Sequence, residues 1–312
     1  MTGSDFPKVK TVEAMDQDAG QRIDNFLLKR LKGVPRNRIY KALRKGEVRV
    51  NGARKKPTYQ IVRGDKIRIP PIRHRESEGG AVIPARLLDH VPVIFEDDAM
   101  LVVDKPAGLA VHGGSGLEYG LIEALRVLRP ELEYLELVHR LDRETSGCLM
   151  LAKSRPALLA LQSQLAESRT MRKQYLALIK GHLDDQGLVV NLPLQHTRDS
   201  MGMRRMVVNK TGQAALTIFK SRQEYADSTL AEVELKTGRM HQVRVHASSS
   251  GHPIAGDRLY GDQAFNDRMK RLGNRRLFLH AERLGLEHPE SGNRCDFYAR
   301  LPVQLEQVIE RL

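Results

Sequence analysis

The stretch VHRLDRETSGCLM, residues 138–150, places a dense polar turn between two apolar runs. The flanking runs, LELV and CLMLA, are typical of buried strands. A polar loop between two such strands sits on a rigid scaffold, and loops of this kind often carry function. The turn holds Asp142 between Arg140 and Arg143, whose charges favour the ionised carboxylate. This setting suits a nucleophile or electrostatic stabiliser better than a general acid, and a solvated surface turn is the structural alternative.

Composition limits the classes of function. The chain has 312 residues, a formal net charge of +13 and a sequence pI near 9.8, which favours a polyanionic partner such as nucleic acid. Two distant cysteines argue against a disulfide scaffold and fit a reducing cytoplasm. The polar start has no signal-peptide pattern, and no apolar run approaches the ~20 residues that span a bilayer. We expect a cytoplasmic monomer without membrane contact.

The N-terminal part predicts a small, basic module. Residues 1–19 are polar, and we expect them to be flexible. From residue 20, helical spacing of Ile23, Phe26 and Leu27 predicts one helix, and Pro35 opens a second. The dipeptide Asn51-Gly52 then predicts a two-residue turn. A polar, glycine-containing linker over residues 72–90 indicates a domain boundary, so we expect domains over residues 20–83 and 84–312.

The positive charge of this module indicates a binding function. Between Arg22 and Arg75 the sequence holds 18 Lys or Arg residues against 3 acids. So few counter-charges weaken the alternative of a merely solvated face and favour phosphate binding by counterion release. The order of elements resembles the S4 RNA-binding domain. The cations that we expect to contact RNA lie on the second helix: Arg36, Arg38, Lys41 and Arg44.

Three further features belong to the larger domain. Lys105-Pro106-Ala107-Gly108 predicts a tight structural turn. Tyr175 begins an apolar strand and could be a simple interfacial aromatic. A helix is expected from Arg239, with Arg244 near its core face, where an unpaired charge is costly and a carboxylate partner is needed.

Cofactor and metal motifs are missing from the sequence. The glycine-rich segment at residues 112–116 lacks the P-loop ending and the dinucleotide spacing. His241 and His246 have no Cys or acid at metal-ligand spacing, so we interpret them as core or polar histidines. We expect neither a cofactor nor a metal. A basic stretch with Arg198, Arg204 and Lys210 fits either an RNA-contacting loop or a solvated hairpin.

Five ordered motifs resemble those of the RluA-type pseudouridine synthases. HRLDRETSG (139–147) resembles the catalytic motif of that family, and KPAG (105–108) resembles its first motif. KQY (173–175) resembles the tyrosine motif, TGRMHQVRVH (237–246) the third, and FLHA (278–281) the closing one. Met240 departs from the pattern, which usually has Thr or Ser there, and we interpret it as a packing change.

The resemblance implies an α+β protein in which an S4 domain precedes a catalytic domain with a mixed, largely antiparallel central sheet. It implies that Asp142 is the nucleophile on a uridine of 23S ribosomal RNA. Tyr175 would then stack on the flipped base and take its proton, and Arg244 would pair with Asp142. His139, Arg140, Arg143 and Leu279 would contact RNA. Two alternatives stay open: the same chemistry on tRNA or another RNA, and a non-catalytic ribosome-assembly factor that binds RNA.

Overall fold

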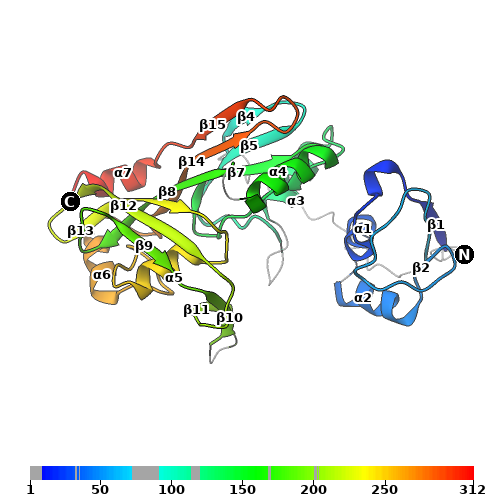
Figure 1. Cartoon of the computed structure of the whole chain (residues 1–312), viewed down its shortest axis with the longest axis horizontal. Coiled ribbons are helices and arrows are strands. Elements are labelled where there is room, and N and C mark those ends of the chain that lie inside the picture. Colours follow the sequence, from blue (N-terminus) through cyan, green and yellow to red (C-terminus); the bar gives the residue numbers. More distant parts are fainter. Residues whose placement is uncertain are drawn as a thin grey trace, which may run out of the picture. The chain divides into compact units, whose positions relative to one another are not determined.

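The computed structural model describes residues 9–31, 34, 36–71, 91–113, 120–167, 170–199, 202 and 204–312. The chain divides into two compact units, Met1–Val82 and Ile83–Leu312, which are described separately (Figure 1). The domain boundary predicted between residues 83 and 84 lies outside the described residues and stays a prediction.

The first unit packs two helices against a three-stranded antiparallel sheet of order β1-β3-β2. Its core gathers apolar side chains from both helices and from alternate positions of β3, including Phe26, Leu43 and Ile67. The helix pair predicted from the sequence is therefore present. The elements are β1 (Lys10–Glu13), the 3₁₀ turn η1 (Asp16–Asp18), α1 (Ile23–Arg30), α2 (Arg36–Lys45), β2 (Arg49–Val50) and β3 (Lys66–Ile69).

The expectation of a flexible segment over residues 1–19 is wrong for its second half. Strand β1 pairs with β3 from Lys10 to Glu13, and the buried carboxylate of Asp18 lies 3.2 Å from the Arg30 guanidinium. An edge strand can be polar because its backbone supplies the pairing, so composition alone did not reveal it. Residues 1–8 lie outside the described part of the chain.

The second unit is built on a ten-stranded sheet. Its main path runs β4-β5-β7-β14-β8-β13-β12-β9, with β15 beside β14 and β6 beside β7. All its strand pairs are antiparallel except β7 with β14, which confirms the predicted mixed, largely antiparallel sheet. The strands are β4 (Val93–Glu96), β5 (Met100–Lys105), β6 (Glu136–Leu137), β7 (Ser146–Ala152), β8 (Arg172–Lys180), β9 (Leu188–Asn191), β12 (Leu216–Glu224), β13 (Ser228–Leu235), β14 (Leu279–Glu287) and β15 (Arg294–Tyr298).

Helices and one separate hairpin complete this unit. The helices are α3 (Leu121–Leu128), α4 (Arg155–Glu167), α5 (Gln242–Ser249), α6 (Gln263–Arg271) and α7 (Val303–Ile309). The hairpin consists of β10 (Leu194–Arg198) and β11 (Arg204–Val208), and it projects from the sheet (Figure 1). The basic stretch around Arg204 is therefore a paired hairpin over its described residues.

Strand β7 explains why the polar loop before it is held firmly. Every residue of SGCLMLA is buried, because alternate side chains enter different clusters: Leu149 and Leu151 one, Cys148 and Met150 the other. The preceding loop is tied down by Lys105, which is fully buried. Its Nζ donates to the carbonyls of Pro106 (2.8 Å), Leu109 (2.9 Å) and Arg143 (3.2 Å), which confirms a structural role for the 105–108 turn.

Gly147 sets the approach of β7 to β14, and its substitution should be severe. Its φ is +111°, and an added Cβ would lie 2.3 Å from the carbonyl oxygen of Ala281, which is rigid backbone. We expect Gly147→Ala to lower the free energy of unfolding by more than ~3 kcal/mol, measured by urea denaturation, because strain and a backbone clash add.

Gly108→Ala is the matched control. Gly108 has φ +86°, but its added Cβ meets no atom within 4 Å. This change should cost only the conformational strain, roughly 1–2 kcal/mol. Equal losses for the two variants would show that the contact with Ala281 does not matter.

Candidate active site

One cavity of about 620 Å³ brings the central residues together. It is lined by the loop before β7, by β8 and by the segment leading into α5, so residues far apart in sequence share one space. Asp142, Tyr175 and Arg244 all line it. The three residues predicted to be catalytic are therefore neighbours.

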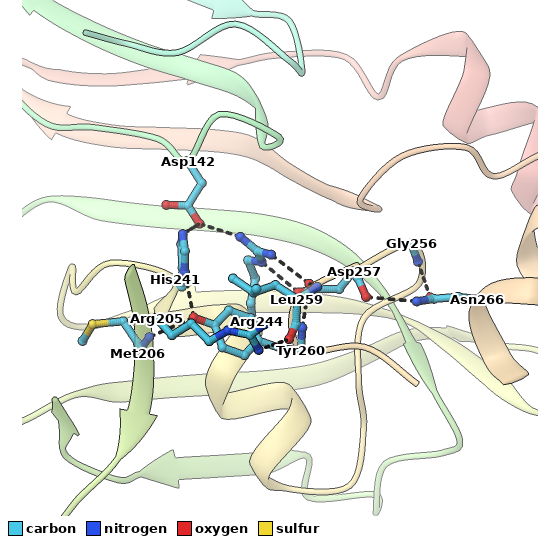
Figure 2. A network of polar contacts seen from close by, with 10 residues as sticks. All are labelled: Asp142, Arg205, Met206, His241, Arg244, Gly256, Asp257, Leu259, Tyr260 and Asn266. Atoms are coloured by element: carbon cyan, nitrogen blue, oxygen red, sulfur yellow. Dashed lines mark hydrogen bonds and ion pairs between the residues drawn. The ribbon is translucent and has the colours of Figure 1, made fainter. Parts of the chain in front are cut away.

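The two oxygens of the Asp142 carboxylate have different surroundings. Oδ2 lies 3.7 Å from Nη1 of Arg244 and 4.0 Å from Nε2 of His241, whereas Oδ1 points away from both (Figure 2). The side chain is only 16% exposed, yet within the described residues neither oxygen accepts a hydrogen bond. A half-buried carboxylate that lies beside the Arg244 guanidinium and accepts no hydrogen bond from the described residues is available for chemistry.

Arg244 forms the expected ion pair with Asp142, at 3.7 Å, and has a second, stronger partner. Its Nε and Nη2 donate to Oδ2 and Oδ1 of Asp257, each at 2.8 Å, and only Nη1 is directed to Asp142 (Figure 2). A guanidinium that is 9% exposed needs a full carboxylate to offset its desolvation, and Asp257 supplies that carboxylate. The sequence had offered no second acid for this site, so Asp257 was missed.

Asp257 is itself held in place. Its Oδ1 also accepts hydrogen bonds from the backbone N–H groups of Leu259 (2.8 Å) and Tyr260 (3.0 Å), and its carbonyl accepts from Asn266 (2.9 Å). Burial acts to raise the pKa of the Asp257 carboxyl, but the bonds from Arg244 and the backbone outweigh it and hold that pKa below its ordinary value. Asp257 is therefore an ionised, fixed anchor for Arg244.

The start of α5 differs from the prediction. The helix begins at Gln242, not Arg239, because the Gln242 side chain takes hydrogen bonds from the hydroxyl of Thr237 (2.7 Å) and the N–H of Arg239 (3.0 Å). This contact keeps the segment before the helix in a turn and places His241 in a left-handed conformation with φ 53°. Interpreted from sequence as a core or polar histidine, His241 faces Asp142 in the structure.

Tyr175 contributes a buried ring and a hydroxyl without a partner in the described part of the chain. It lies on β8 and lines the cavity. Burial raises the pKa of the phenol well above its ordinary value, and the Asp142 charge adds to this effect. The hydroxyl is therefore neutral, and the ring offers a flat apolar face to a ligand.

The predicted RNA-contacting residues of this unit divide into two groups. His139, Arg140 and Leu279 line the cavity, whereas Arg143 does not and instead donates to the Gly108 carbonyl at 3.0 Å. His139 accepts from the Met150 N–H at 3.1 Å, and burial lowers the pKa of this imidazole to about 4. Its neutral ring thus fastens the loop to β7.

The four basic residues predicted on the second helix belong to the other unit. Lys41 and Arg44 are exposed, and Arg38 pairs with Glu47 at 2.7 Å. The side chain of Arg36 lies outside the described residues. Lys41 and Arg44 are therefore the better candidates for contacts with phosphate.

Lys173 is a site residue that the sequence analysis did not single out. It lies two positions before Tyr175 on β8, so strand periodicity places both on one face, and this signal could have identified it. Its side chain is buried in the cavity wall, and in the described ranges no acceptor meets its Nζ. Burial lowers the pKa of this amine to about 8.

Neither a metal centre nor a membrane span is formed by the described residues. No group of three or more His, Cys, Asp or Glu side chains among them is placed to hold a metal ion. His246, predicted to be a core or polar histidine, is satisfied by Thr217 and by the Leu192 carbonyl, both at 2.9 Å. No helix in the described ranges is long and apolar enough to cross a bilayer.

Removing the Asp257 charge should destabilise the protein and change its acid sensitivity. Asp257→Asn removes the carboxylate that is hydrogen-bonded to the buried Arg244 guanidinium, so we expect a loss of ~3–5 kcal/mol in urea denaturation at pH 7. The pKa of Asp257 is lower in the folded protein than the ordinary carboxyl value near ~4. Its ionised form therefore stabilises the fold above that pH, and this stabilisation is lost as the pH falls through ~4 and below. The variant should therefore lose less stability between pH 5 and pH 3 than the parent.

Asp296→Asn is the control for that change. Asp296 pairs with Arg283 at 3.0 Å, but both side chains are about 30% exposed. Such a pair contributes only ~0–1 kcal/mol. If both variants lost the same stability, burial of the Arg244–Asp257 pair would not be the cause.

Comparisons with known proteins agree with this arrangement. The family model described as RNA pseudouridylate synthase matches residues 99–249, and the S4 domain model matches residues 21–67. The ribosomal large subunit pseudouridine synthase C of Escherichia coli K12 is 47% identical over 316 residues, covering 99% of this chain and 98% of the relative. The protein of that name from Haemophilus influenzae is 45% identical over 309 residues, covering 97% and 95%.

A solved structure agrees as well. Human RNA pseudouridylate synthase domain containing 4 matches with a TM-score of 0.59 and 27% identity, over 73% of this chain and 94% of that one. The full-length similarity, the two domain matches and the shared fold lead to one conclusion. This chain belongs to the RluA-type family of pseudouridine synthases, which are isomerases, and it carries an S4 RNA-binding domain before the catalytic domain.

Proposed function

We propose that this enzyme converts specific uridines of 23S ribosomal RNA to pseudouridine. The observation that carries the proposal is the Asp142 carboxylate, which lies in a nucleotide-sized cavity with one oxygen beside Arg244 and the other uncommitted. The relatives named above act on the large ribosomal subunit by their names, and they match nearly the whole chain. Their similarity supports the same class of substrate here.

The reaction moves one bond and one proton. The bond between uracil N1 and ribose C1′ is replaced by a bond between C5 and C1′, while C5 loses a proton and N1 gains one. No atom is added and no electron is transferred, so the reaction needs no redox partner. We assign Asp142 as the nucleophile, attacking through Oδ1, because Oδ2 is the oxygen that faces Arg244 and His241. Attack on the ribose and attack on the base are both compatible with this geometry.

Arg244 and Tyr175 take supporting roles in this proposal. The free Nη1 of Arg244 stabilises ionised Asp142, while Asp257 keeps the guanidinium in place. The Tyr175 ring stacks on the base in the cavity. The expectation that Tyr175 also removes the proton needs an ionised phenol, which burial disfavours, so we assign it the stacking role alone.

Access to the uridine requires that the nucleotide leaves its helix. Flipping a base costs a few kcal/mol of unstacking, which contacts with the RNA backbone offset. Arg140 at the cavity and the exposed cations of α2 are suited to such contacts. With ribosomal RNA as substrate, the cytoplasm is the expected compartment. We also propose that the enzyme acts as a monomer.

A modification map of ribosomal RNA and tRNA from a deletion strain tests the substrate. Loss of pseudouridines in 23S RNA, restored by the wild-type gene, is the expected result. Loss confined to tRNA would assign the same chemistry to the other substrate. An unchanged map with defective ribosome assembly would favour a non-catalytic RNA-binding factor.

Asp142→Asn tests the central role. This change keeps the shape of the side chain but removes its charge and most of its nucleophilicity, so pseudouridine formation should fall below detection while RNA affinity changes little. Glu144→Gln is the control, since Glu144 is exposed on the same loop and does not line the cavity. Its activity should stay near wild type. Substantial turnover by Asp142→Asn would contradict the assignment.

The S4 surface is tested through salt dependence. Replacing Lys41 and Arg44 together by Gln should weaken RNA binding and reduce the slope of log affinity against log salt by roughly 0.7–0.9 for each lost phosphate contact. The control replaces Arg63 and Lys66, two exposed cations on other elements of the same unit. If both pairs changed the slope equally, α2 would have no special part in binding.

A further inference from the structure

His241 is the second group that faces the catalytic carboxylate. Its Nε2 lies 4.0 Å from Oδ2 of Asp142, on the same oxygen that Arg244 approaches (Figure 2). The His241 side chain is 17% exposed, and His241 occupies the N-cap position of α5. What it offers to Asp142 depends on which ring nitrogen carries the proton.

The contacts of Tyr260 favour one tautomer. Its Oη accepts a hydrogen bond from the N–H of Met206 at 2.9 Å and lies 2.8 Å from Nδ1 of His241. A backbone N–H can only donate, so the phenol proton is free to be given to Nδ1, and the described residues offer it no other acceptor. Nδ1 then accepts, and the proton of a neutral imidazole must be on Nε2, which faces Asp142. Burial lowers the pKa of His241 and favours this neutral form.

The ring is held in this orientation at a cost. The left-handed backbone of His241, with φ 53° and ψ 19°, is strained for a residue with a Cβ. Tyr260 packs edge-on against the imidazole, with ring centroids 5.5 Å apart, and the Arg244 guanidinium lies 5.1 Å above the Tyr260 ring. Backbone strain persists where the surroundings fix it, and such places cluster at functional sites.

We propose that His241 and Tyr260 are positioning residues: Tyr260 fixes His241 as an Nε2–H donor that holds Oδ2 of Asp142 and so reserves Oδ1 for attack. The inference rests on the proposed role of Asp142. A hydrogen bond requires the 4.0 Å separation to shorten by about 1 Å, and catalytic hydrogen bonds commonly tighten when substrate binds. Arg244 and His241 then hold one carboxylate oxygen from two sides.

A purely structural role is the alternative to exclude. Tyr260 also fastens the β10–β11 hairpin, through Met206, and the guanidinium of Arg205 donates to the Leu259 carbonyl at 3.3 Å. His241 could therefore serve only to connect α5 with this hairpin. If His241 only connects these elements, its substitution should lower the stability of the protein or its RNA affinity. If His241 donates to Asp142, its substitution should slow the chemical step.

Two substitutions of His241 separate these roles. His241→Asn removes the Nε2 donor but tolerates the left-handed backbone, so the protein should fold. His241→Gln places an amide N–H near the position of Nε2. We expect kcat on unmodified 23S RNA transcript to fall about 10- to 100-fold in His241→Asn, the effect of a lost hydrogen bond to a charged group, with KM changed less than about twofold. His241→Gln should recover most of kcat.

Tyr260→Phe is the second, independent variant. It removes only the hydroxyl that fixes the tautomer and keeps the ring beneath Arg244, so kcat should fall by less than in His241→Asn, with KM again unchanged. Wild-type kcat in His241→Asn, or equal impairment of the Asn and Gln variants, overturns the inference. Turnover by wild type and its absence in Asp142→Asn, measured in the same assay, test the underlying function separately.

Discussion

The buried ion pair between Arg244 and Asp257 is the interaction on which the site depends. A buried guanidinium needs a carboxylate that accepts two of its hydrogen bonds. Asp257 accepts two such bonds from Arg244, each of 2.8 Å. Because Asp257 is in turn fixed by two backbone N–H groups, the Arg244 side chain has one available position. That position leaves Nη1 directed to Asp142, so a rigid charge faces the carboxylate that we propose as the nucleophile.

The Asp142 loop is positioned by contacts that leave its carboxylate free. Lys105 binds the Arg143 carbonyl, and His139 accepts from the Met150 N–H, so both fasten backbone on either side of Asp142. Gly147 allows β7 to approach β14 where a side chain would collide with Ala281. Lys105, His139 and Gly147, which belong to the sequence motifs, therefore position the backbone of the loop. The carboxylate of Asp142 remains free for the proposed chemistry.

The sequence predicted the fold class, the two helices of the S4 unit and the residues Asp142, Tyr175 and Arg244. The two helices were predicted from apolar periodicity and turn residues, whereas the fold class and the roles of the three residues were implied by the family resemblance of contiguous motifs. Asp257 could not be found in this way, since a single Asp in a loop has no period or spacing, and its importance exists only through contact with Arg244. The part of His241 depends on a left-handed backbone and on the hydroxyl of Tyr260, neither of which a linear pattern encodes. Strand β1 was missed because its pairing is made by backbone.

The division of labour between two acids explains why the site needs both. If Arg244 bound Asp142 through two hydrogen bonds, both oxygens of the proposed nucleophile would be engaged, and attack would first have to weaken one of these bonds. If Asp257 were absent, the guanidinium would move toward Asp142 or toward water to reduce its desolvation cost. With Asp257 satisfying Arg244, Asp142 keeps a stabilising charge at 3.7 Å while its carboxylate accepts no hydrogen bond from the described residues. The fixed carboxylate of Asp257 thus leaves the Asp142 carboxylate available for the attack that we propose.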